Sequence, residues 1–461
     1  MNRKISVVGL GKLGASMAAA IASKGHQVVG VDVNHRSVDA VNRGEAPVQE
    51  TGLHELIERN RERLRATMSH EDAIRDSELT FAIVPTPSDE RGAFSLQYVA
   101  YAFREIGKAL ARKNQWHTVV LTSTVLPGAM RHGLIPVLEK HSGKKAGVDF
   151  GVCYSPEFIA LGSVIRDFLN PDFLLIGELE PRSGEHLAAC YADIIGAATP
   201  VKRMSLENAE LAKIAVNAFV TTKITFANML AELCAAMPGG DVDVVSDAVG
   251  MDSRIGRKYF TGALGFGGPC FPRDNVALGF IAGVLGARPD LPLTTDRLNR
   301  SLVDRVLQQL APRVGRDVTV AILGLAYKPQ SHVIEDSQAI RMAKAFLEHG
   351  ARVLAYDPLA GEYANLELGG RVLIMDNPCD CLRDADVVLV TTPDPEFKAL
   401  TARDFRQEGR PVLVVDFWRL LSAQLSGADN IEYMPYGRRD AAAESDVLKQ
   451  LWSETPLHYG R

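Results

Sequence analysis

Apolar and polar positions follow a regular order through the first part of the chain. A β-branched run over residues 5–9 is followed by a glycine-rich turn, a small-residue helix over 15–23 and a second apolar run over 27–33. Further strands are expected at 79–84 and 118–122, with amphipathic helices between them. Strands that alternate with helices are typical of a parallel, doubly wound sheet.

The pattern changes near Ser205. Residues 207–236 form a long stretch with few helix breakers, rich in Ala, Leu, Lys and Glu, which Pro238 and two glycines end sharply. Helical sequence continues beyond this point and is interrupted by the segment 262–272. This part of the chain predicts a central helical region with one long helix.

A second alternating unit begins near Asp317. Its expected strand over 318–323, helix over 337–348 and strand over 352–356 repeat the order of the opening unit. Asp357 follows the second strand here, as Asp32 does in the opening unit, and the segment 385–393 is similar to 77–87. We interpret this as an internal repeat and predict an α/β fold. Two Rossmann-like, doubly wound domains would be joined by a central helical domain, with domains at residues 1–204, 205–312 and 313–461.

Composition narrows the class of protein. Of 461 residues, 46% are hydrophobic and 23% charged, which excludes a disordered, collagen-like or disulfide-scaffold chain. The 51 basic and 56 acidic residues give a net charge of −5, which argues against nucleic acid or an anionic membrane as a partner. The six cysteines show no zinc-binding pattern. The N-terminus lacks a long apolar signal core, so we expect a reduced, cytoplasmic protein without a bound metal.

The turn after the first strand has the pattern G-x-G-x-x-G and reads Gly9-Leu10-Gly11-Lys12-Leu13-Gly14. Its glycines allow a tight turn, close approach of a pyrophosphate and close helix packing, and the helix N-terminus faces the phosphates. Asp32 ends the next strand, where an acid hydrogen-bonds a ribose 2′-hydroxyl. Because Asp32 would repel the 2′-phosphate that Arg36 could bind, the sequence favours NAD over NADP. A purely structural turn is the alternative.

Hydroxyl side chains stand at the ends of two later strands. Thr86 follows one of them and Ser123-Thr124 the other. Ligands of open α/β sheets bind beyond the carboxyl ends of the strands, which favours a ligand contact. Ordinary hydrogen bonding within a turn explains the hydroxyl residues at both strand ends equally well.

Further candidate residues lie in the middle of the chain. Lys213 and Asn217 are four residues apart on the long helix, so they share one face among small and apolar neighbours. Cys270 lies in a glycine-rich loop that runs into a helix start, where the helix dipole raises the thiolate fraction of a cysteine. Asp274 follows it, and Glu157 stands in Ser155-Pro156-Glu157-Phe158. The alternative for a cysteine is a small buried hydrophobe, which we retain for the other five.

These motifs together resemble the UDP-glucose/GDP-mannose dehydrogenase family over nearly the whole length of the chain. The stretch 117–178 is particularly similar to the GDP-mannose branch. The segments that carry the resemblance are 9–14 with Asp32, 123–128, 155–158 with 165–168, 210–213 with Asn217, 265–274 and 324–329.

The resemblance implies a four-electron oxidation of a sugar C6 alcohol to a carboxylate with two NAD in succession. The Cys270 thiolate would attack the intermediate aldehyde, giving a thiohemiacetal and then a thioester that water releases as the uronic acid. Lys213 and Asn217 would stabilise the oxyanion at C6. Asp274 or Glu157 would activate water, and Thr124 would help to order it.

The resemblance also implies binding residues. Arg254 would reach the sugar across a subunit interface, which implies at least a homodimer, and Lys328 with Arg419 would hold the nucleotide of a UDP- or GDP-sugar. The implied cofactor-binding residues are Gly9, Gly11, Lys12, Leu13, Gly14, Asp32, Thr86 and Thr124. The implied substrate-binding residues are Glu157, Phe158, Ile159, Lys213, Asn217, Arg254, Phe266, Gly267, Lys328 and Arg419.

The sequence departs from the family pattern in three places. Ile159-Ala160-Leu161 replaces Leu-Arg-Glu or Leu-Ala-Glu, so one sugar-facing carboxylate is missing. Glu335 stands where an arginine contacts the NAD pyrophosphate, and Arg273 replaces a lysine. UDP-glucose, GDP-mannose and a UDP-N-acetylhexosamine therefore all stay open as substrates. The alternatives to this reaction are a two-electron β-hydroxyacid-type dehydrogenase and a catalytically inactive nucleotide-sugar sensor.

Overall fold

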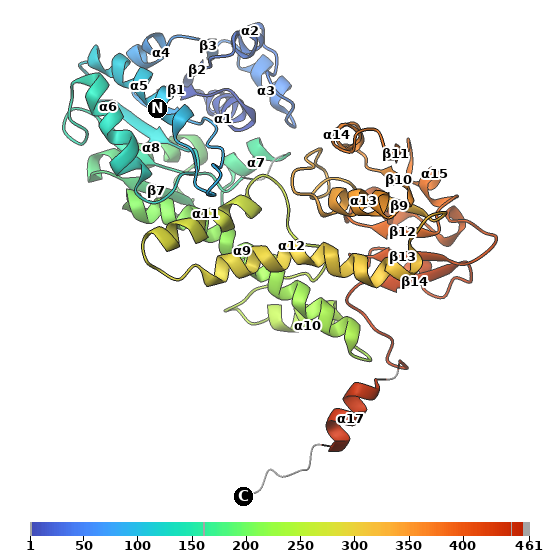
Figure 1. Cartoon of the computed structure of the whole chain (residues 1–461). Helices are drawn as coiled ribbons and strands as arrows, with labels where there is room; N and C mark the ends of the chain where they lie inside the picture. The colour runs from blue at the N-terminus through green and yellow to red at the C-terminus, as the bar shows by residue number, and fades with distance from the viewer. Residues whose placement is uncertain (1, 160–161, 444, 455–461) are drawn as a thin grey trace, which may run out of the picture. The chain divides into compact units, whose positions relative to one another are not determined.

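The computed structural model describes residues 2–159, 162–443 and 445–454 (Figure 1). The chain divides into two compact units, residues 1–216 with 276–289 and residues 217–275 with 290–461. The division passes through two helices, α9 (Leu206–Ala236) and α11 (Phe271–Val284). The three sequence domains with boundaries near residues 205 and 313 stay a prediction.

The first unit is built on an eight-stranded sheet of order β3-β2-β1-β4-β5-β6-β7-β8, parallel except between β6 and β7. Its first six strands follow the 3-2-1-4-5-6 order of dinucleotide-binding sheets. The predicted strands in this unit are confirmed, although the second ends at Val31 rather than residue 33 and the third at Ala82 rather than residue 84. After the second strand, Asp32 turns toward the neighbouring loop and accepts from the Leu10 N–H. The strands are β1 (Lys4–Val8), β2 (Gln27–Val31), β3 (Leu64–Thr67), β4 (Leu79–Ala82), β5 (Thr118–Leu121), β6 (Gly151–Tyr154), β7 (Leu174–Glu178) and β8 (Val201–Ser205).

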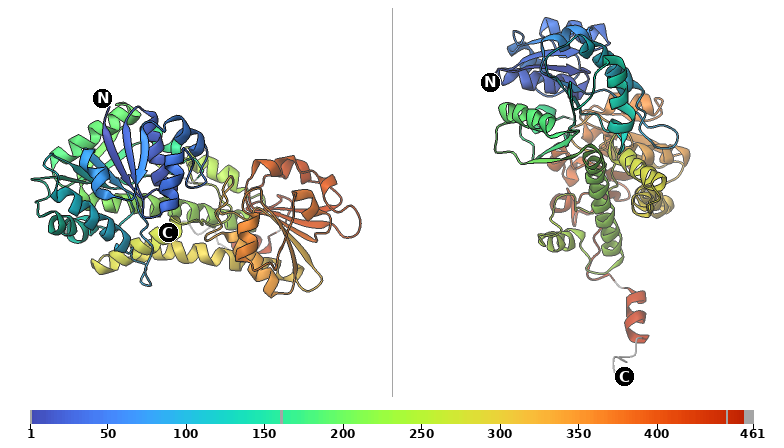
Figure 2. Two further views of the ribbon diagram at one scale, coloured as in Figure 1. Left: turned by 90° about the horizontal axis from the view of Figure 1, so that it is seen from above. Right: turned by 90° about the vertical axis from the view of Figure 1, so that its left-hand side faces the viewer.

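Helices cover both faces of this sheet (Figures 1 and 2). Alternate strand residues point to opposite faces, so Ile5 and Val7 of β1 pack under α1 and α8, whereas Val8 packs with α5 and α6. The helices of the first unit are α1 (Lys12–Ser23), α2 (His35–Arg43), α3 (Leu53–Arg59), α4 (His70–Asp76), α5 (Gln97–Ala111), the π-helix η1 (Ala129–Leu134), α6 (Ile135–Ser142), α7 (Val164–Leu169) and α8 (Pro181–Ile195).

The second unit contains a six-stranded, fully parallel sheet of order β11-β10-β9-β12-β13-β14. Its strand order again corresponds to 3-2-1-4-5-6, which confirms the predicted second Rossmann-like sheet. The strands are β9 (Thr319–Leu323), β10 (Arg352–Tyr356), β11 (Leu373–Ile374), β12 (Val387–Val390), β13 (Val412–Asp416) and β14 (Ile431–Pro435). The helices are α10 (Val242–Gly250), α12 (Asp290–Leu310), α13 (Gln338–Glu348), α14 (Gly361–Glu367), α15 (Pro378–Leu382), α16 (Ser422–Leu425) and α17 (Asp446–Glu454).

The long helix predicted over 207–236 is confirmed as α9, which spans 31 residues. Ile214, Ala227 and Ala231 are fully buried, whereas Phe219 and Leu233 are more than half exposed. Among the described residues α9 is the one helix long and apolar enough to cross a membrane. Length and composition alone are weak evidence for that, because the core helix of a soluble protein meets the same criteria.

The internal repeat is a repeat of hydrogen bonds. Gly9 and Gly324 both have positive φ, +96° and +99°, at the turn after the first strand of their sheets. The Leu10 N–H donates to Asp32 Oδ2 over 2.7 Å. In the second unit the Leu325 N–H donates to Oδ2 of Asp357, which follows the neighbouring strand, also over 2.7 Å. The similarity seen along the sequence therefore reflects one construction used twice.

We predict that two glycines of the first turn differ sharply in tolerance to a methyl group. A Cβ on Gly14 would lie 1.9 Å from the Gly9 carbonyl oxygen, whereas a Cβ on Gly11 would meet no atom within 4 Å. Because backbone cannot move aside cheaply, Gly14→Ala should lower the free energy of unfolding by ~1–3 kcal/mol. The matched variant Gly11→Ala should change it by less than about 0.5 kcal/mol. Urea denaturation without cofactor measures both, and equal losses would contradict the steric explanation.

Candidate active site

The glycine turn between β1 and α1 is shaped by three different local requirements. Gly9 needs its positive φ, and a Cβ there would lie 2.0 Å from the Ile83 carbonyl oxygen. Gly14 packs directly on Gly9. Gly11 faces open space at the start of α1, which suits a pyrophosphate lying against backbone N–H groups and the positive helix end. The residues present therefore fit a dinucleotide, with Lys12 and Leu13 in the first turn of α1.

Both carboxylate oxygens of Asp32 accept hydrogen bonds from the backbone at this turn. Its Oδ2 accepts from the Leu10 N–H and its Oδ1 accepts from the Asn34 N–H over 2.8 Å. A carboxylate oxygen has two acceptor positions, so both oxygens retain capacity for a ribose hydroxyl. The acid thus orients the glycine turn in addition to facing the place where the ribose is predicted.

The carboxyl ends of β4 and β5 are tied together beside this turn. The Ser123 hydroxyl donates to the Val84 carbonyl and accepts from the Val84 N–H. The Thr86 hydroxyl donates to the Thr124 carbonyl over 2.8 Å. Since β1 and β4 are neighbours at the point where the strand order reverses, these hydroxyls lie at the switch point where ligands bind. Their contact with a cofactor stays a prediction.

Lys213 and Glu157 lie together in the first unit. The Lys213 ammonium donates to the Glu157 backbone carbonyl and lies 4.5 Å from the centroid of the Phe158 ring. Burial raises the pKa of the Glu157 carboxyl to about 7, opposed by Lys213 and by a hydrogen bond with Tyr191. Its Oε1 has no hydrogen-bond partner in the described chain. A carboxyl of this kind exchanges a proton near neutral pH. The next predicted contact, Ile159, packs against the core that includes α1.

Cys270, Asp274 and Asn217 lie together in the second unit. Cys270 immediately precedes α11, and its carbonyl accepts the first helical hydrogen bond from the Asp274 N–H over 2.9 Å. The predicted loop leading into a helix start is therefore confirmed. Asp274 is 2% exposed, and its Oδ2 accepts from the Asn217 side-chain amide over 2.7 Å. Cys270 is exposed, whereas four of the other five cysteines are buried.

Sequence reasoning missed the side chains that hold the Cys270 loop. The Asn299 amide pairs with both backbone groups of Phe266, accepting from its N–H and donating to its carbonyl over 2.9 Å each. Gln338 also donates to that carbonyl. A Cβ on Gly267 would lie 2.5 Å from the Asp336 carbonyl oxygen. The density of glycines was the one signal in the sequence, because the partners lie 33 or more residues further along the chain.

Three residues implied in binding the sugar or the nucleotide have different surroundings. The Arg254 side chain is 86% exposed and pairs with Asp252. Lys328 places its ammonium 5.7 Å from the centroid of the Tyr327 ring. Arg419 has a positive φ of 55°, and its side chain is 1% exposed. Its guanidinium forms a two-pronged pair with Asp243 and donates to the carbonyls of Gly262, Phe417 and Tyr436.

The contacts of Arg419 are thus internal, and its contribution to nucleotide binding stays a prediction. Glu335 uses its backbone carbonyl to accept from the Gly268 N–H over 2.8 Å. Ala160 and Leu161, which replace sugar-facing residues of the family, lie outside the described residues.

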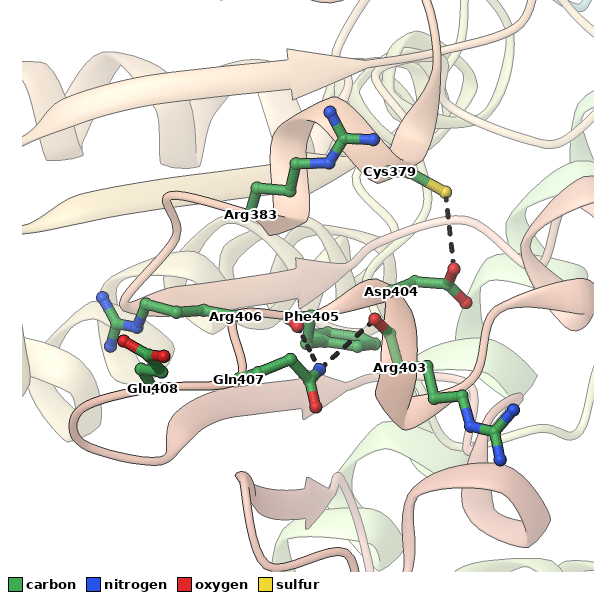
Figure 3. A pocket seen from close by; sticks show the side chains of 8 residues that line it. All are labelled: Cys379, Arg383, Arg403, Asp404, Phe405, Arg406, Gln407 and Glu408. Carbon is green, nitrogen blue, oxygen red and sulfur yellow. Dashed lines mark hydrogen bonds between the residues drawn. The ribbon is translucent and has the colours of Figure 1, made fainter.

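A cavity of about 540 Å³ in the second unit contains none of the predicted site residues. Figure 3 shows its arginine side chains pointing in different directions, so their charges do not converge on one ligand position. The Cys379 thiol at this cavity donates to the Asp404 carboxylate. The cavity is lined by Cys379, Arg383, Arg403, Asp404, Phe405, Arg406, Gln407 and Glu408.

An open glycine turn at the switch point of a parallel sheet binds dinucleotides, and the first domain of the chain matches an NAD-binding model over residues 3–195. The protein is an NAD-dependent oxidoreductase that acts on a CH–OH group. The match continues over residues 207–301 with a central domain and over 321–423 with a UDP binding domain. The chain therefore belongs to the UDP-glucose/GDP-mannose dehydrogenase family, a family of nucleotide-sugar dehydrogenases.

Individual relatives support this membership. The chain is 38% identical to the UDP-glucose 6-dehydrogenase of Haloferax volcanii, over 91% of this chain and 97% of the relative. It is 34% identical to the GDP-mannose 6-dehydrogenase of Azotobacter vinelandii, over 90% and 97% of the two chains. A solved UDP-glucose dehydrogenase from Pyrobaculum islandicum, 34% identical, superposes with a TM-score of 0.85 over 95% of this chain and 98% of that chain.

We predict that removing the charge of Asp32 narrows the preference for NAD over NADP. Asp32→Asn keeps an acceptor for the Leu10 N–H but no longer repels a 2′-phosphate. The ratio of kcat/KM for NAD to that for NADP should fall about tenfold, which corresponds to roughly 1.4 kcal/mol. Asp357→Asn is the matched control. It changes the equivalent hydrogen bond of the second sheet, from the Leu325 N–H to Asp357, and should leave the ratio unchanged. A parent enzyme that uses both cofactors equally would contradict the assignment.

Proposed function

We propose that the protein oxidises the C6 alcohol of a UDP- or GDP-sugar to the uronic acid in two NAD-dependent steps, with Cys270 as the covalent nucleophile. The observation that carries this proposal is the exposed thiol at the start of α11, with Asp274 in the first turn of the same helix. The helix N-terminus favours a thiolate there. Asn217 holds the Asp274 carboxylate from α9.

In the proposed reaction, NAD supplies a hydride acceptor for each of the two oxidations. The sugar alcohol loses a proton and a hydride and becomes an aldehyde. The Cys270 thiolate adds to the aldehyde carbon, and the new oxyanion takes a proton to give a thiohemiacetal. Loss of a second hydride and a proton leaves a thioester. Water adds to the thioester, and the carbon–sulfur bond breaks to release the acid and the thiol.

The polar residues of the site have different roles in this reaction. Lys213 and Asn217 donate hydrogen bonds to the oxyanion that develops at C6. Glu157, with its pKa raised to about 7, and Asp274 are the two carboxyls that accept a proton or activate water. Thr124 helps to order that water. Raised pKa values of buried carboxyls are typical of catalytic acids and bases, which supports the assignment of Glu157.

The nucleotide end of the substrate would bind to the second sheet. Lys328 would place a positive charge near the diphosphate, and the backbone of Phe266 and Gly267 would shape the sugar pocket. Arg419 is enclosed by its own chain, so its contribution would be to fix the turn after β13. The match of residues 321–423 to a UDP binding domain supports this placement.

We further propose that two copies of the chain associate through the exposed apolar faces of α9 and α10. Phe219 is 66% exposed and Leu233 57% on α9, Val244 on α10 is 66% exposed, and Met251, which follows α10, is 87% exposed. Exposed apolar side chains that form one contiguous patch are typical of subunit interfaces. Arg254 lies three residues beyond Met251 with its side chain 86% exposed, which suits the predicted reach into the sugar site of a second copy.

We predict that Cys270→Ser abolishes formation of the uronic acid while NAD still binds. A serine hydroxyl is a far weaker nucleophile, so acid formation should fall by roughly 1,000-fold or more. Cys379→Ser, at a half-buried cysteine in the second unit, should retain the parent rate.

Two NADH should form per sugar in the parent enzyme. Acid formation by Cys270→Ser at the parent rate would overturn the covalent mechanism. One NADH per sugar in the parent would indicate the two-electron alternative, and none a nucleotide-sugar sensor.

We propose a UDP-linked 2-acetamido sugar as one of three candidate substrates, beside UDP-glucose and GDP-mannose. The family carboxylate missing from the sequence at residues 160–161 would be an unsuitable partner for an acetamido group, so its absence keeps such a sugar open as a substrate. NADH production across UDP- and GDP-sugars, with and without the acetamido group, measures this. Strong preference for UDP-glucose with no turnover of acetamido sugars would show that residues 160–161 do not set specificity.

A further inference from the structure

A fully buried carboxylate joins α9 to the segment that follows β5. Glu210 lies on α9 one turn before Lys213 and is 0% exposed. Its Oε2 accepts from the Gly128 N–H over 2.6 Å, and its Oε1 accepts from the Met130 N–H over 2.8 Å. Both oxygens thus bind backbone donors at the start of the π-helix η1. Such donors have no partner within the helix itself.

The joined segment is the one that carries Thr124. Its beginning is held by Ser123, which bonds to Val84, and by the Thr86 hydroxyl on the Thr124 carbonyl. Its apolar side chains also pack toward α9, where Leu126 contacts the cluster around the buried Ile214. Glu210 supplies the polar contact at the other end of the segment. The π-helix that starts there is a rare conformation.

We propose that Glu210 is a positioning residue for the active site, which holds the Thr124 segment at a set place relative to Lys213. It acts through the backbone of Gly128 and Met130 and touches neither substrate nor cofactor. This inference rests on the proposed function for the part of Thr124 and Lys213. We call the two hydrogen bonds that Glu210 accepts from Gly128 and Met130 the clamp, and both lie within the first unit.

The surroundings of Glu210 explain why a carboxylate serves here. Burial raises its pKa from the ordinary value of 4.5 to about 7, opposed by the two backbone donors. The charged groups that act on it are Glu207 on α9, which raises the pKa, and Arg131 on η1, which lowers it. These two also pair with each other.

The sign of the pH effect follows from the raised pKa. The folded protein binds the proton more tightly than the unfolded chain, so this group's contribution to stability decreases as pH rises from 4.5 to 7. The two hydrogen bonds of the clamp show the opposite trend with pH, because they weaken as pH falls. Below pH 7 one oxygen carries a proton and is a poorer acceptor, so one backbone donor loses its partner.

The test replaces Glu210 by glutamine and compares it with a control one turn earlier. In Glu210→Gln the amide NH₂ faces a backbone N–H, so one of the two hydrogen bonds is lost. Glu207→Gln removes the charge that pairs with Arg131 on the same segment and leaves the clamp intact. We expect amide exchange at Gly128 and Met130 to accelerate about tenfold in Glu210→Gln at pH 8, and the Kd for NAD to rise by a similar factor. The control should change neither.

Two outcomes would overturn the proposal. Unchanged exchange at Gly128 and Met130 would show that Glu210 does not hold the segment. Faster exchange with an unchanged Kd for NAD would show a purely structural role. Neither measurement needs a sugar substrate. A parent enzyme that oxidises no nucleotide sugar would therefore refute the proposed function. The exchange rates and the Kd for NAD would still show whether Glu210 holds the segment. Glu210→Ala, which removes both acceptors, should exceed the effect of the glutamine variant where it folds.

Discussion

Both sheets depend on a hydrogen bond between a backbone N–H in the turn after the first strand and the aspartate that ends the next strand. The turn glycine leaves this N–H without a helical partner, and a buried donor needs an acceptor. Asp32 supplies it in the first unit and Asp357 in the second. The bond sets the direction in which the chain enters the following segment. In the first sheet the Gly11 position that follows faces open space.

Two buried carboxyls of the first unit show how surroundings decide the use of the same group. Glu157 and Glu210 both have a pKa raised to about 7 by burial. One oxygen of Glu157 has no hydrogen-bond partner in the described residues, which suits proton exchange. Both oxygens of Glu210 bind backbone donors, which suits the holding of a loop. The number of hydrogen-bond donors at each site distinguishes the two carboxyls, although their pKa values do not.

The cysteine loop illustrates a third constraint, the lack of space around a backbone. Gly267 and Gly268 lie against Asp336 and the Tyr327 ring, where a Cβ would come within 2.5 and 2.6 Å of another atom. The loop is therefore enclosed before Cys270 and exposed at the thiol. Asn299 completes this arrangement by pairing with Phe266. A thiol at an enclosed loop and a helix start can be both reactive and fixed in position.

The sequence by itself determined the elements and the residues whose chemistry is local. Periodicity placed β1, β2, β4 and β5 of the first sheet, β9 and β10 of the second, and α9. The glycine turn with Asp32 indicated the dinucleotide, because these signals depend on neighbours in the chain. The spacing of Lys213 and Asn217, and Cys270 before a helix, were readable for the same reason. Only the tertiary structure decided the partners of Glu210, Asn299 and Arg419. Their hydrogen bonds join segments 33 to 176 residues apart, and no local pattern records which backbone groups folding will bury together.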